Sequence, residues 1–322
     1  MLRMEAFEFV AASSYAEALA LWAPDAMYVA GGTDLMPNLK HRLFSPKRVI
    51  GLGGISGGVR EEAGSICIGA ATTLDVMATD SVLLGAITPL AKAAGLVAGP
   101  QIRAMGTLGG NILLDTRCLY YNQSESWRKS LGYCLKKEGT WCHVVGGPKT
   151  CVASQSSDTV PVLLGLDASI RLLGPAGERE MRLRDLFRFN GMDHLAILPG
   201  ELLTEVVIPK PSAGFRGSYE KVRTRDSIDF PQVGVSVTGT WDGNIAKALD
   251  IVIGAVNPQP KPVRGLEAHL GRAMDGENIA AIADLVYKQT RPQASAHGDT
   301  AWRRQMAAVL VRRALAKLGT EC

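Results

Sequence analysis

The sequence lacks the features that would assign it to a membrane or to nucleic acid. No stretch reaches the roughly 20 uncharged apolar residues that a membrane span requires. The first ten residues contain acids where a secretory signal peptide needs a continuous apolar run. Charges are nearly balanced, with 35 basic and 31 acidic side chains, so the basic excess typical of nucleic-acid binding is missing. These absences predict a cytoplasmic protein with neither membrane nor nucleic acid as a partner.

What is present is the composition of an ordinary globular protein. The chain has 322 residues, of which 47% are hydrophobic, enough for more than one core. It contains six cysteines. Because cytoplasmic thiols stay reduced, a group of cysteines is expected to bind metal or do redox work. Cys67 lies in an alternating strand pattern and is expected to be a buried small hydrophobe.

Apolar periodicity predicts the order of helices and strands. The region after residue 214 has strands first and helices afterwards, which predicts an antiparallel sheet with helices on one face. Two prolines make 209–214 the best candidate linker, and 115–153 shows neither period, as in a long functional loop. Helices are expected at 15–22, 88–98, 262–270, 277–290 and 300–318, and strands at 28–30, 65–71, 168–173, 202–209, 218–223, 232–241 and 248–256, with a hairpin turn at 242–244.

Two glycine-rich turns are candidates for phosphate binding. They are Ala30-Gly31-Gly32-Thr33-Asp34 and Thr107-Leu108-Gly109-Gly110-Asn111. Glycine lets the backbone approach a pyrophosphate closely and point N–H groups at its oxygens. Threonine hydroxyls add donors, Asp34 can accept from sugar hydroxyls, and Asn111 can hold a loop or reach the ligand. A double glycine alone is more often a simple turn, and the Rossmann spacing is absent, so a standard nicotinamide fold is not supported.

Further segments in the same order make the pattern specific. Ser157-Asp158-Thr159-Val160-Pro161 and Tyr219-Glu220-Lys221-Val222-Arg223 follow the two turns. Together these segments resemble the FAD-binding subunit of the xanthine dehydrogenase and carbon monoxide dehydrogenase family. The resemblance implies an α+β protein with a two-lobed FAD-binding domain at 1–213, its lobes at about 1–55 and 56–213, and a C-terminal α+β domain at 214–322.

The resemblance also implies roles for individual residues. It places Asp158 on the FAD sugar and Lys221 at the isoalloxazine edge, whereas Lys221 alone reads as a solvated strand lysine. No residue of this chain is expected to be catalytic, because the substrate chemistry would belong to a partner subunit. The implied FAD-binding residues are Val29, Ala30, Gly31, Gly32, Thr33, Asp34, Leu35, Val97, Thr107, Gly109, Gly110, Asn111, Asp115, Asp158, Leu203 and Lys221.

A cysteine-containing loop at 115–153 interrupts the family pattern. Most of the family reaches the Ser-Asp-x-x-Pro segment after a much shorter stretch. The loop contains Cys118, Cys134, Cys142 and Cys151. By count, four thiolates suit a tetrahedral zinc ion or a [4Fe–4S] cluster equally well. The short C-x₂₋₄-C knuckles of structural zinc sites are absent, which favours the larger cluster, and His143 is expected to be a loop hydrogen-bonder.

Within the family, this loop is similar to that of the 4-hydroxybenzoyl-CoA reductase branch. The likeness implies that ferredoxin delivers electrons through a [4Fe–4S] cluster and FAD to a small subunit with two [2Fe–2S] clusters and a molybdenum-cofactor large subunit, in a dimer of heterotrimers. There 4-hydroxybenzoyl-CoA would be dehydroxylated to benzoyl-CoA. The alternatives are an oxidative member acting on an aldehyde, a purine or carbon monoxide with a zinc-filled loop, and a metal-stabilised scaffold whose glycine turns bind nothing.

Overall fold

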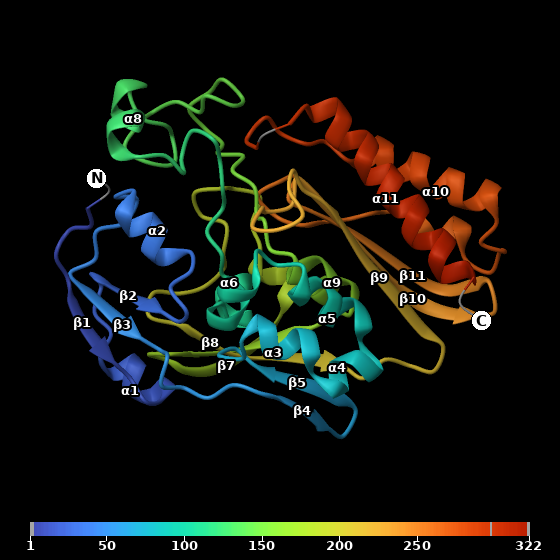
Figure 1. Cartoon of the computed structure of the whole chain (residues 1–322), viewed down its shortest axis with the longest axis horizontal. Coiled ribbons are helices and arrows are strands. Elements are labelled where there is room, and N and C mark those ends of the chain that lie inside the picture. The colour runs from blue at the N-terminus through green and yellow to red at the C-terminus, as the bar shows by residue number, and fades with distance from the viewer. Residues whose placement is uncertain (1–2, 297, 321–322) are drawn as a thin grey trace.

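The structure is a computed structural model that describes residues 3–296 and 298–320. Within these residues the chain forms three β-sheets in succession, each with its own helices (Figure 1). The first sheet lies in the N-terminal lobe, the second forms the base of the molecule in this view, and the third leads to the C-terminal helices. This confirms the expected α+β fold with a C-terminal antiparallel sheet.

The first sheet is a small parallel sheet with a helix on each face. The strand order is β1-β3-β2, and both pairings are parallel. Neighbouring residues of a strand point to opposite faces. Accordingly, Ile50 packs with Ala18 of the first helix, while Val49 packs with Leu39 of the second. The elements are β1 (Glu8–Ala11), α1 (Tyr15–Ala20), β2 (Ala26–Val29), α2 (Leu35–Lys40) and β3 (Arg48–Gly51).

The second sheet is antiparallel and carries helices on one face. Ile66, Ile68, Ile170 and Val206 point into this core and are fully buried, whereas Glu205 on the other face pairs with surface arginines. Cys67 is buried in the central part of this sheet, as expected. The strand order is β4 (Val59–Glu62), β5 (Ser65–Gly69), β8 (Leu202–Pro209), β6 (Ser169–Gly174) and β7 (Gly177–Arg182), and the helices are α3 (Leu74–Thr79), α4 (Ser81–Ala86), α5 (Thr88–Gly95), α6 (Pro100–Met105), α7 (Leu108–Ile112), α9 (Thr159–Gly165) and the 3₁₀ turn η1 (Leu183–Leu186).

The third sheet is covered on both faces. Val235 and Ile251 pack with Val311 of the last helix, while Tyr219 and Val252 belong to the core of the second sheet. The helices expected on one face are therefore present, and the opposite face rests on α5 and α9. The strand order is β12 (Lys261–Pro262), β11 (Ile245–Gly254), β10 (Val233–Asp242) and β9 (Phe215–Val222), followed by α10 (Gly276–Gln289) and α11 (Thr300–Thr320).

The helix expected at 262–270 is wrong. Its start is the edge strand β12, and its remainder contains only the 3₁₀ turn η2 (Leu266–His269). Pro262 pairs with Val252 in the sheet, and Gly265 has φ 82. A left-handed residue at this point ends any right-handed helical path.

The loop at 115–153 is a folded unit that projects beside α2 (Figure 1). Its two ends meet, because Arg117 and Ser154 exchange backbone hydrogen bonds of 2.9 and 2.8 Å. It also contains the short helix α8 (Glu125–Ser130), capped by Ser124, which was not predicted because six residues are too short to show a helical period. Buried Arg128 attaches the helix by donating to the carbonyls of His41, Gln123 and Arg42 at 2.9, 2.7 and 3.1 Å.

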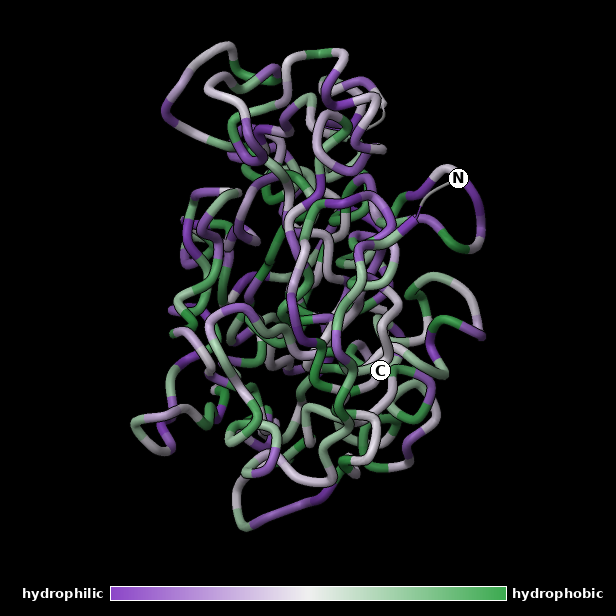
Figure 2. The backbone as a smooth tube through the Cα atoms, turned by 90° about the vertical axis from the view of Figure 1, so that its left-hand side faces the viewer, coloured by the Kyte–Doolittle hydropathy of each residue, from purple (hydrophilic) through white to green (hydrophobic). Residues whose placement is uncertain are grey.

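Hydrophobic residues occur in short stretches distributed along the whole chain (Figure 2). Among the described residues, no helix combines the length and apolar character needed to cross a membrane.

Candidate cofactor pocket and cysteine cavity

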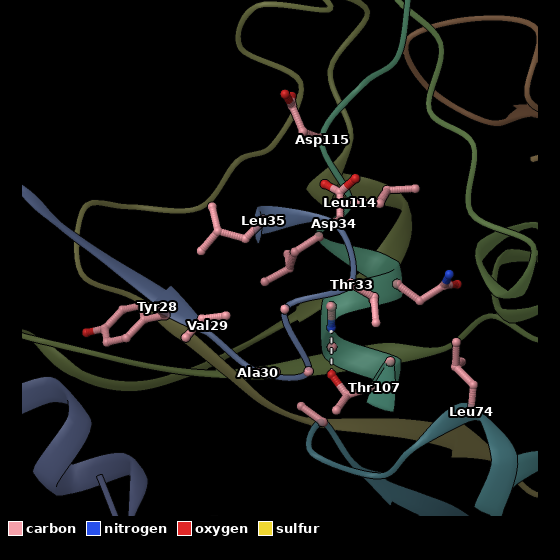
Figure 3. Close-up of a pocket in the computed structure, with 18 of the residues that line it drawn as sticks. Tyr28, Val29, Ala30, Thr33, Asp34, Leu35, Leu74, Thr107, Leu114 and Asp115 are labelled. Carbon is pink, nitrogen blue, oxygen red and sulfur yellow. Dashed lines mark hydrogen bonds between the residues drawn. The ribbon is translucent and has the colours of Figure 1, made fainter. Parts of the chain in front are cut away.

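One cavity of about 580 Å³ opens where the three sheet regions meet. This volume is typical of small-molecule and cofactor sites. Both glycine turns reach it, and Figure 3 shows Thr33 and Thr107 on its wall with Asp34 and Asp115 nearby. Most of the lining comes from six segments, which lie at 27–35, 70–74, 97–115, 156–158, 194–203 and 228–230, and the rest consists of Tyr15, Asn38, Phe44 and Leu52.

The first glycine turn joins β2 to α2 and packs tightly against the end of α6. A Cβ on Gly31 would lie 1.7 Å from the carbonyl oxygen of Met105, and Gly32 has φ +70. No side chain fits at position 31, and the backbone conformation at position 32 strongly favours glycine. In the described part of the chain, no hydrogen bond uses the N–H groups of Gly31, Gly32 or Thr33 as donors. These donors therefore remain available to an anionic ligand.

The second turn begins α7 and uses its N–H groups within the fold. Gly109 N–H donates to the carbonyl of Ala70 at 2.9 Å, and Gly110 N–H donates to the Thr107 hydroxyl at 3.1 Å. The expectation that both groups bind the pyrophosphate needs correction, because each already has a partner. Gly109 allows tight packing within the fold, since a Cβ there would lie 3.0 Å from the Ala70 side chain.

Asn111 connects the second turn to the Ser-Asp segment. Its side-chain oxygen accepts hydrogen bonds from the hydroxyls of Ser157 at 2.6 Å and Thr159 at 2.7 Å. Asn111 was expected either to hold a loop or to reach the ligand, and these hydrogen bonds show the first role. The contact brings the start of α9, and with it Asp158, to the pocket wall.

Asp158 forms a buried ion pair with Lys221. The ammonium lies 3.0 Å from both carboxylate oxygens and also donates to the carbonyl of Leu96 at 2.9 Å. Tyr219 donates its hydroxyl to Asp158 at 2.7 Å. Burial raises the pKa of Asp158 and lowers that of Lys221, and each charge opposes the shift of the other. Asp158 lines the cavity, whereas Lys221 lies behind it.

Asp34 and Asp115 bring two carboxylates to another part of the wall (Figure 3). Asp34 accepts from Arg117 at 2.8 Å and from Asn38 at 3.0 Å. Burial raises the pKa of Asp34, and the positive charge of Arg117 opposes this shift. The Arg117 guanidinium also lies 4.2 Å from the centre of the Phe230 ring, a cation–π contact.

With the exception of Lys221, every predicted FAD-binding residue lines this one cavity. The prediction missed several lining residues, which include Tyr28, His194, Ile228 and Phe230. The last three lie outside regular elements, where periodicity gives no signal. Buried His194 bonds to the carbonyl of Leu114 at 3.2 Å, and burial lowers its pKa.

A second, smaller cavity lies within the inserted loop and is lined by all four of its cysteines. All four are free thiols. Cys134, Cys142 and Cys151 are each 5–6% exposed. His143 also lines this cavity and contacts the carbonyl of Tyr133 at 2.6 Å, which fits the expected role of a loop hydrogen-bonder.

Tight turns present these cysteines. The carbonyl oxygen of Cys134 accepts from the N–H groups of Lys137 and Gly139 at 2.9 and 3.0 Å, and Cys142 exchanges backbone hydrogen bonds with the turn at 146–147. The backbone N–H groups of Tyr120 and Ala153 lower the pKa of Cys118 and of Cys151 respectively, which opposes the effect of burial.

Burial disfavours charge on these sulfurs. It raises the pKa of Cys118 to about 12, and it also raises the pKa of Cys151. A bound cation reverses this preference, because a metal-coordinating thiol is deprotonated outright. Among residues 3–296 and 298–320, no three His, Cys, Asp or Glu side chains are gathered tightly enough to hold a single metal ion.

The chain matches known proteins along nearly its full length. Residues 5–211 match the family described as FAD binding domain in molybdopterin dehydrogenase, and residues 217–318 match the CO dehydrogenase flavoprotein C-terminal domain. It is 30% identical to the carbon monoxide dehydrogenase medium chain of Afipia carboxidovorans, over 96% of this chain and 95% of that one. It is 31% identical to the aldehyde oxidoreductase FAD-binding subunit PaoB of Escherichia coli, over 90% and 92%.

Solved structures agree with these relationships. The reconstituted CO dehydrogenase from Oligotropha carboxidovorans superimposes with a TM-score of 0.81 at 27% identity, covering 99% of this chain and 100% of that chain. The chain therefore belongs to the FAD-binding medium subunits of the xanthine dehydrogenase and CO dehydrogenase family of molybdenum hydroxylases.

Proposed function

We propose that this chain binds FAD in the 580 Å³ cavity and serves as the electron-transfer subunit of a molybdenum-containing oxidoreductase. The observation that carries this is the convergence of distant segments, both glycine turns among them, on one cavity. The first turn supplies free N–H groups for the pyrophosphate, helped by the Thr33 hydroxyl, and the second turn contributes Thr107, Gly110 and Asn111 to the cavity wall. Bound FAD would store and pass on electrons, and the protein would position it.

The other proposed contacts with FAD involve two carboxylates. Asp34 and Asp158 line the cavity and can accept hydrogen bonds from sugar or ribityl hydroxyls. Lys221 neutralises Asp158 from behind, so we propose that it acts on the cofactor mainly by holding this carboxylate charged and in place. Partner subunits with a molybdenum cofactor and [2Fe–2S] clusters would carry out the substrate chemistry.

We further propose that Cys118, Cys134, Cys142 and Cys151 hold a [4Fe–4S] cluster. Their common cavity and the backbone N–H groups that favour the thiolate forms of Cys118 and Cys151 support a thiolate-bound metal group. A zinc ion requires four sulfurs about 2.3 Å from one point. A cubane takes its ligands at separate corners, which suits cysteines spread over a long loop better.

Two substrate classes remain as candidates, each with its own support. The likeness of the loop to that of 4-hydroxybenzoyl-CoA reductases supports reductive dehydroxylation of 4-hydroxybenzoyl-CoA with electrons from ferredoxin. The names of the relatives, carbon monoxide dehydrogenase and aldehyde oxidoreductase, support oxidation of carbon monoxide or an aldehyde. The relatives give the oxidative candidate the broader support.

Anaerobic purification followed by assays of iron, sulfide, zinc and FAD tests the cofactor proposal. We expect one FAD and about four irons per chain. The variant Cys134→Ser should lose iron and keep FAD, while Cys67→Ser should keep both, because Cys67 lies away from the loop in the second sheet. One zinc without iron would overturn the cluster but keep the flavin subunit, and absence of FAD would overturn the whole proposal.

Activity of the complete complex separates the two substrate classes. Reductive turnover is measured as benzoyl-CoA formed from 4-hydroxybenzoyl-CoA with reduced ferredoxin. Oxidative turnover is measured with carbon monoxide, aldehydes or purines and an artificial electron acceptor. Turnover in only one assay decides between the candidates.

A further inference from the structure

One buried ion pair separates the flavin cavity from the cysteine cavity. Asp115 lines the first cavity and Lys136 lines the second. The Lys136 ammonium lies 2.6 Å from the Asp115 carboxylate, and their side chains are only 6% and 18% exposed. The two cavities therefore share a wall that carries a negative end on one side and a positive end on the other.

The surroundings of Lys136 fix this orientation. Its ammonium also contacts the carbonyl of Thr116 at 2.9 Å and the Thr116 hydroxyl at 2.6 Å, and it lies 4.2 Å from the centre of the Tyr121 ring. Tyr121 in turn donates its hydroxyl to Asp115 at 2.9 Å. Every ammonium proton thus has a partner, so the charge cannot swing towards solvent.

A second ion pair lies on the flavin side. Asp34 lines the flavin cavity, and the guanidinium of its partner Arg117, 2.8 Å away, lies 4.2 Å from the ring centre of Phe230, another residue of that cavity. Lys136, in contrast, lines the cysteine cavity. The Asp115–Lys136 pair therefore extends from one cavity to the other, whereas the Asp34–Arg117 pair stays beside the flavin cavity.

We propose that Lys136 is a positioning residue whose fixed charge raises the reduction potential of the metal group held by the four cysteines, and that Asp115 opposes it. This inference rests on the proposed [4Fe–4S] cluster. Four thiolates give such a cluster a net negative charge that grows on reduction, and nearby charge is one of the factors that set its potential. A cation at the cavity wall therefore stabilises the reduced form, and it acts strongly because burial keeps solvent screening low.

The orientation also has a consequence for electron flow. Lys136 lowers the free energy of an electron on the cluster, whereas Asp115 raises the free energy of an electron on the flavin. The pair therefore favours electrons on the loop side and opposes their transfer from the cluster to the flavin.

Redox titration of the anaerobically purified complex tests the proposal, with the iron signal followed by electron paramagnetic resonance. In Lys136→Met, which removes the charge, the ratio of reduced to oxidised centre at the wild-type midpoint should fall about tenfold, or about 59 mV for a one-electron couple. In Asp115→Asn the unbalanced Lys136 charge should shift the potential the opposite way. Lys136→Arg should stay near wild type, and exposed Lys149→Met is the matched control.

Opposite shifts are the decisive result, because damage to the loop would move both variants in one direction. Unchanged or same-direction potentials, with wild-type iron and FAD contents, would overturn this inference and leave the cofactor assignment intact. Wild-type protein without iron would overturn the cluster and this inference together. Should Lys136→Met lose its iron, Asp115→Asn still decides, because it retains the lysine and must show a raised potential.

Discussion

At the scale of single residues, buried charges mark the site. Asp158 and Lys221 are 4% and 2% exposed at the side chain, yet each is fully partnered by the other and by neighbouring groups. Burying two charges costs desolvation energy that only good geometry offsets. The pair is stable while both charges are present. Removal of one partner leaves an unpaired buried charge, which destabilises the folded protein.

Replacement of Lys221 by methionine should therefore destabilise the protein strongly. We expect a loss of about 3–5 kcal/mol in the free energy of unfolding, because the Asp158 charge would remain buried without its cation. Urea unfolding followed by fluorescence measures this loss. The double variant Lys221→Met/Asp158→Asn should lose less than the sum of the single variants, and Lys288→Met, at an exposed pair, is the surface control. Equal losses in Lys221→Met and Lys288→Met would contradict the argument.

The resemblance to the family identified fewer than half of the residues that line the pocket, and most of those identified belong to the two glycine turns. Gly31 and Asp34 belong to one such turn, and neighbours in a turn face the same ligand. Lys221 differs because it does not line the cavity. A strand pattern predicts which face of the sheet a side chain points to, but not which residue it contacts there. Phe230 was missed because the loop before β10 has no periodicity.

At the scale of elements, a close contact between two chain segments shapes the phosphate end of the pocket. The β2–α2 turn approaches the last residues of α6 so closely that a Cβ on Gly31 would overlap the Met105 carbonyl. Both partners are backbone, so neither can rotate away. The turn keeps its free N–H groups in place only while this contact holds.

Gly31→Ala should consequently weaken FAD binding by at least tenfold, or about 1.4 kcal/mol. The added methyl group forces the turn and α6 apart and displaces the donors from the pyrophosphate. Fluorescence titration of FAD-depleted protein gives the dissociation constant. Gly53→Ala is the matched control, because a Cβ there meets nothing within 4 Å. Unchanged affinity in Gly31→Ala would show that this turn does not determine binding.

A second element-scale prediction concerns the attachment of the inserted loop. Arg128→Met retains the apolar stem but removes the donors to three carbonyls, and hydrogen bonds to charged groups contribute about 1.5–3 kcal/mol. We expect faster proteolysis within 118–151 and loss of iron, with FAD retained. Exposed Lys129→Met should behave as wild type. Simultaneous loss of FAD would indicate that the loop and the pocket do not unfold separately.

Elements with a strong period or a clear turn were predictable from the sequence, whereas short or highly charged ones, including the central four-residue strand β3, were not. The β10–β11 hairpin and the helices α10 and α11 lie close to their expected positions. Strands β4 and β7 were missed, since Val59–Glu62 and Gly177–Arg182 are mostly exposed and charged and lack an apolar face. They form because a neighbouring strand supplies hydrogen bonds, and local sequence patterns do not reveal this pairing.

At the scale of the whole molecule, the flavin pocket is where the separate parts of the chain meet. Its wall combines the first sheet at 27–35, the helices of the second sheet at 97–115, and the loop 228–230 that precedes β10. The cysteine loop is in turn tied to the C-terminal part, because Leu119 N–H donates to the Ser295 carbonyl at 2.8 Å and the hydroxyls of Ser154 and Ser295 lie 2.9 Å apart. A ligand in this pocket therefore touches every sheet region.

Removal of FAD should accordingly loosen all three regions together and not one lobe alone. Binding to the folded state contributes about 2.7 kcal/mol at a free FAD concentration of 100 times the dissociation constant, so FAD-free protein should unfold at a lower temperature. Hydrogen exchange should show lost protection at 30–36, 106–111 and 228–230, and added FAD should restore it. Riboflavin, which lacks the pyrophosphate, should leave 30–34 unprotected because the free N–H groups of the first turn would have no anion to bind. Loss of protection confined to one region would mean that FAD occupies only part of this cavity and that the meeting of the three sheet regions is independent of the cofactor.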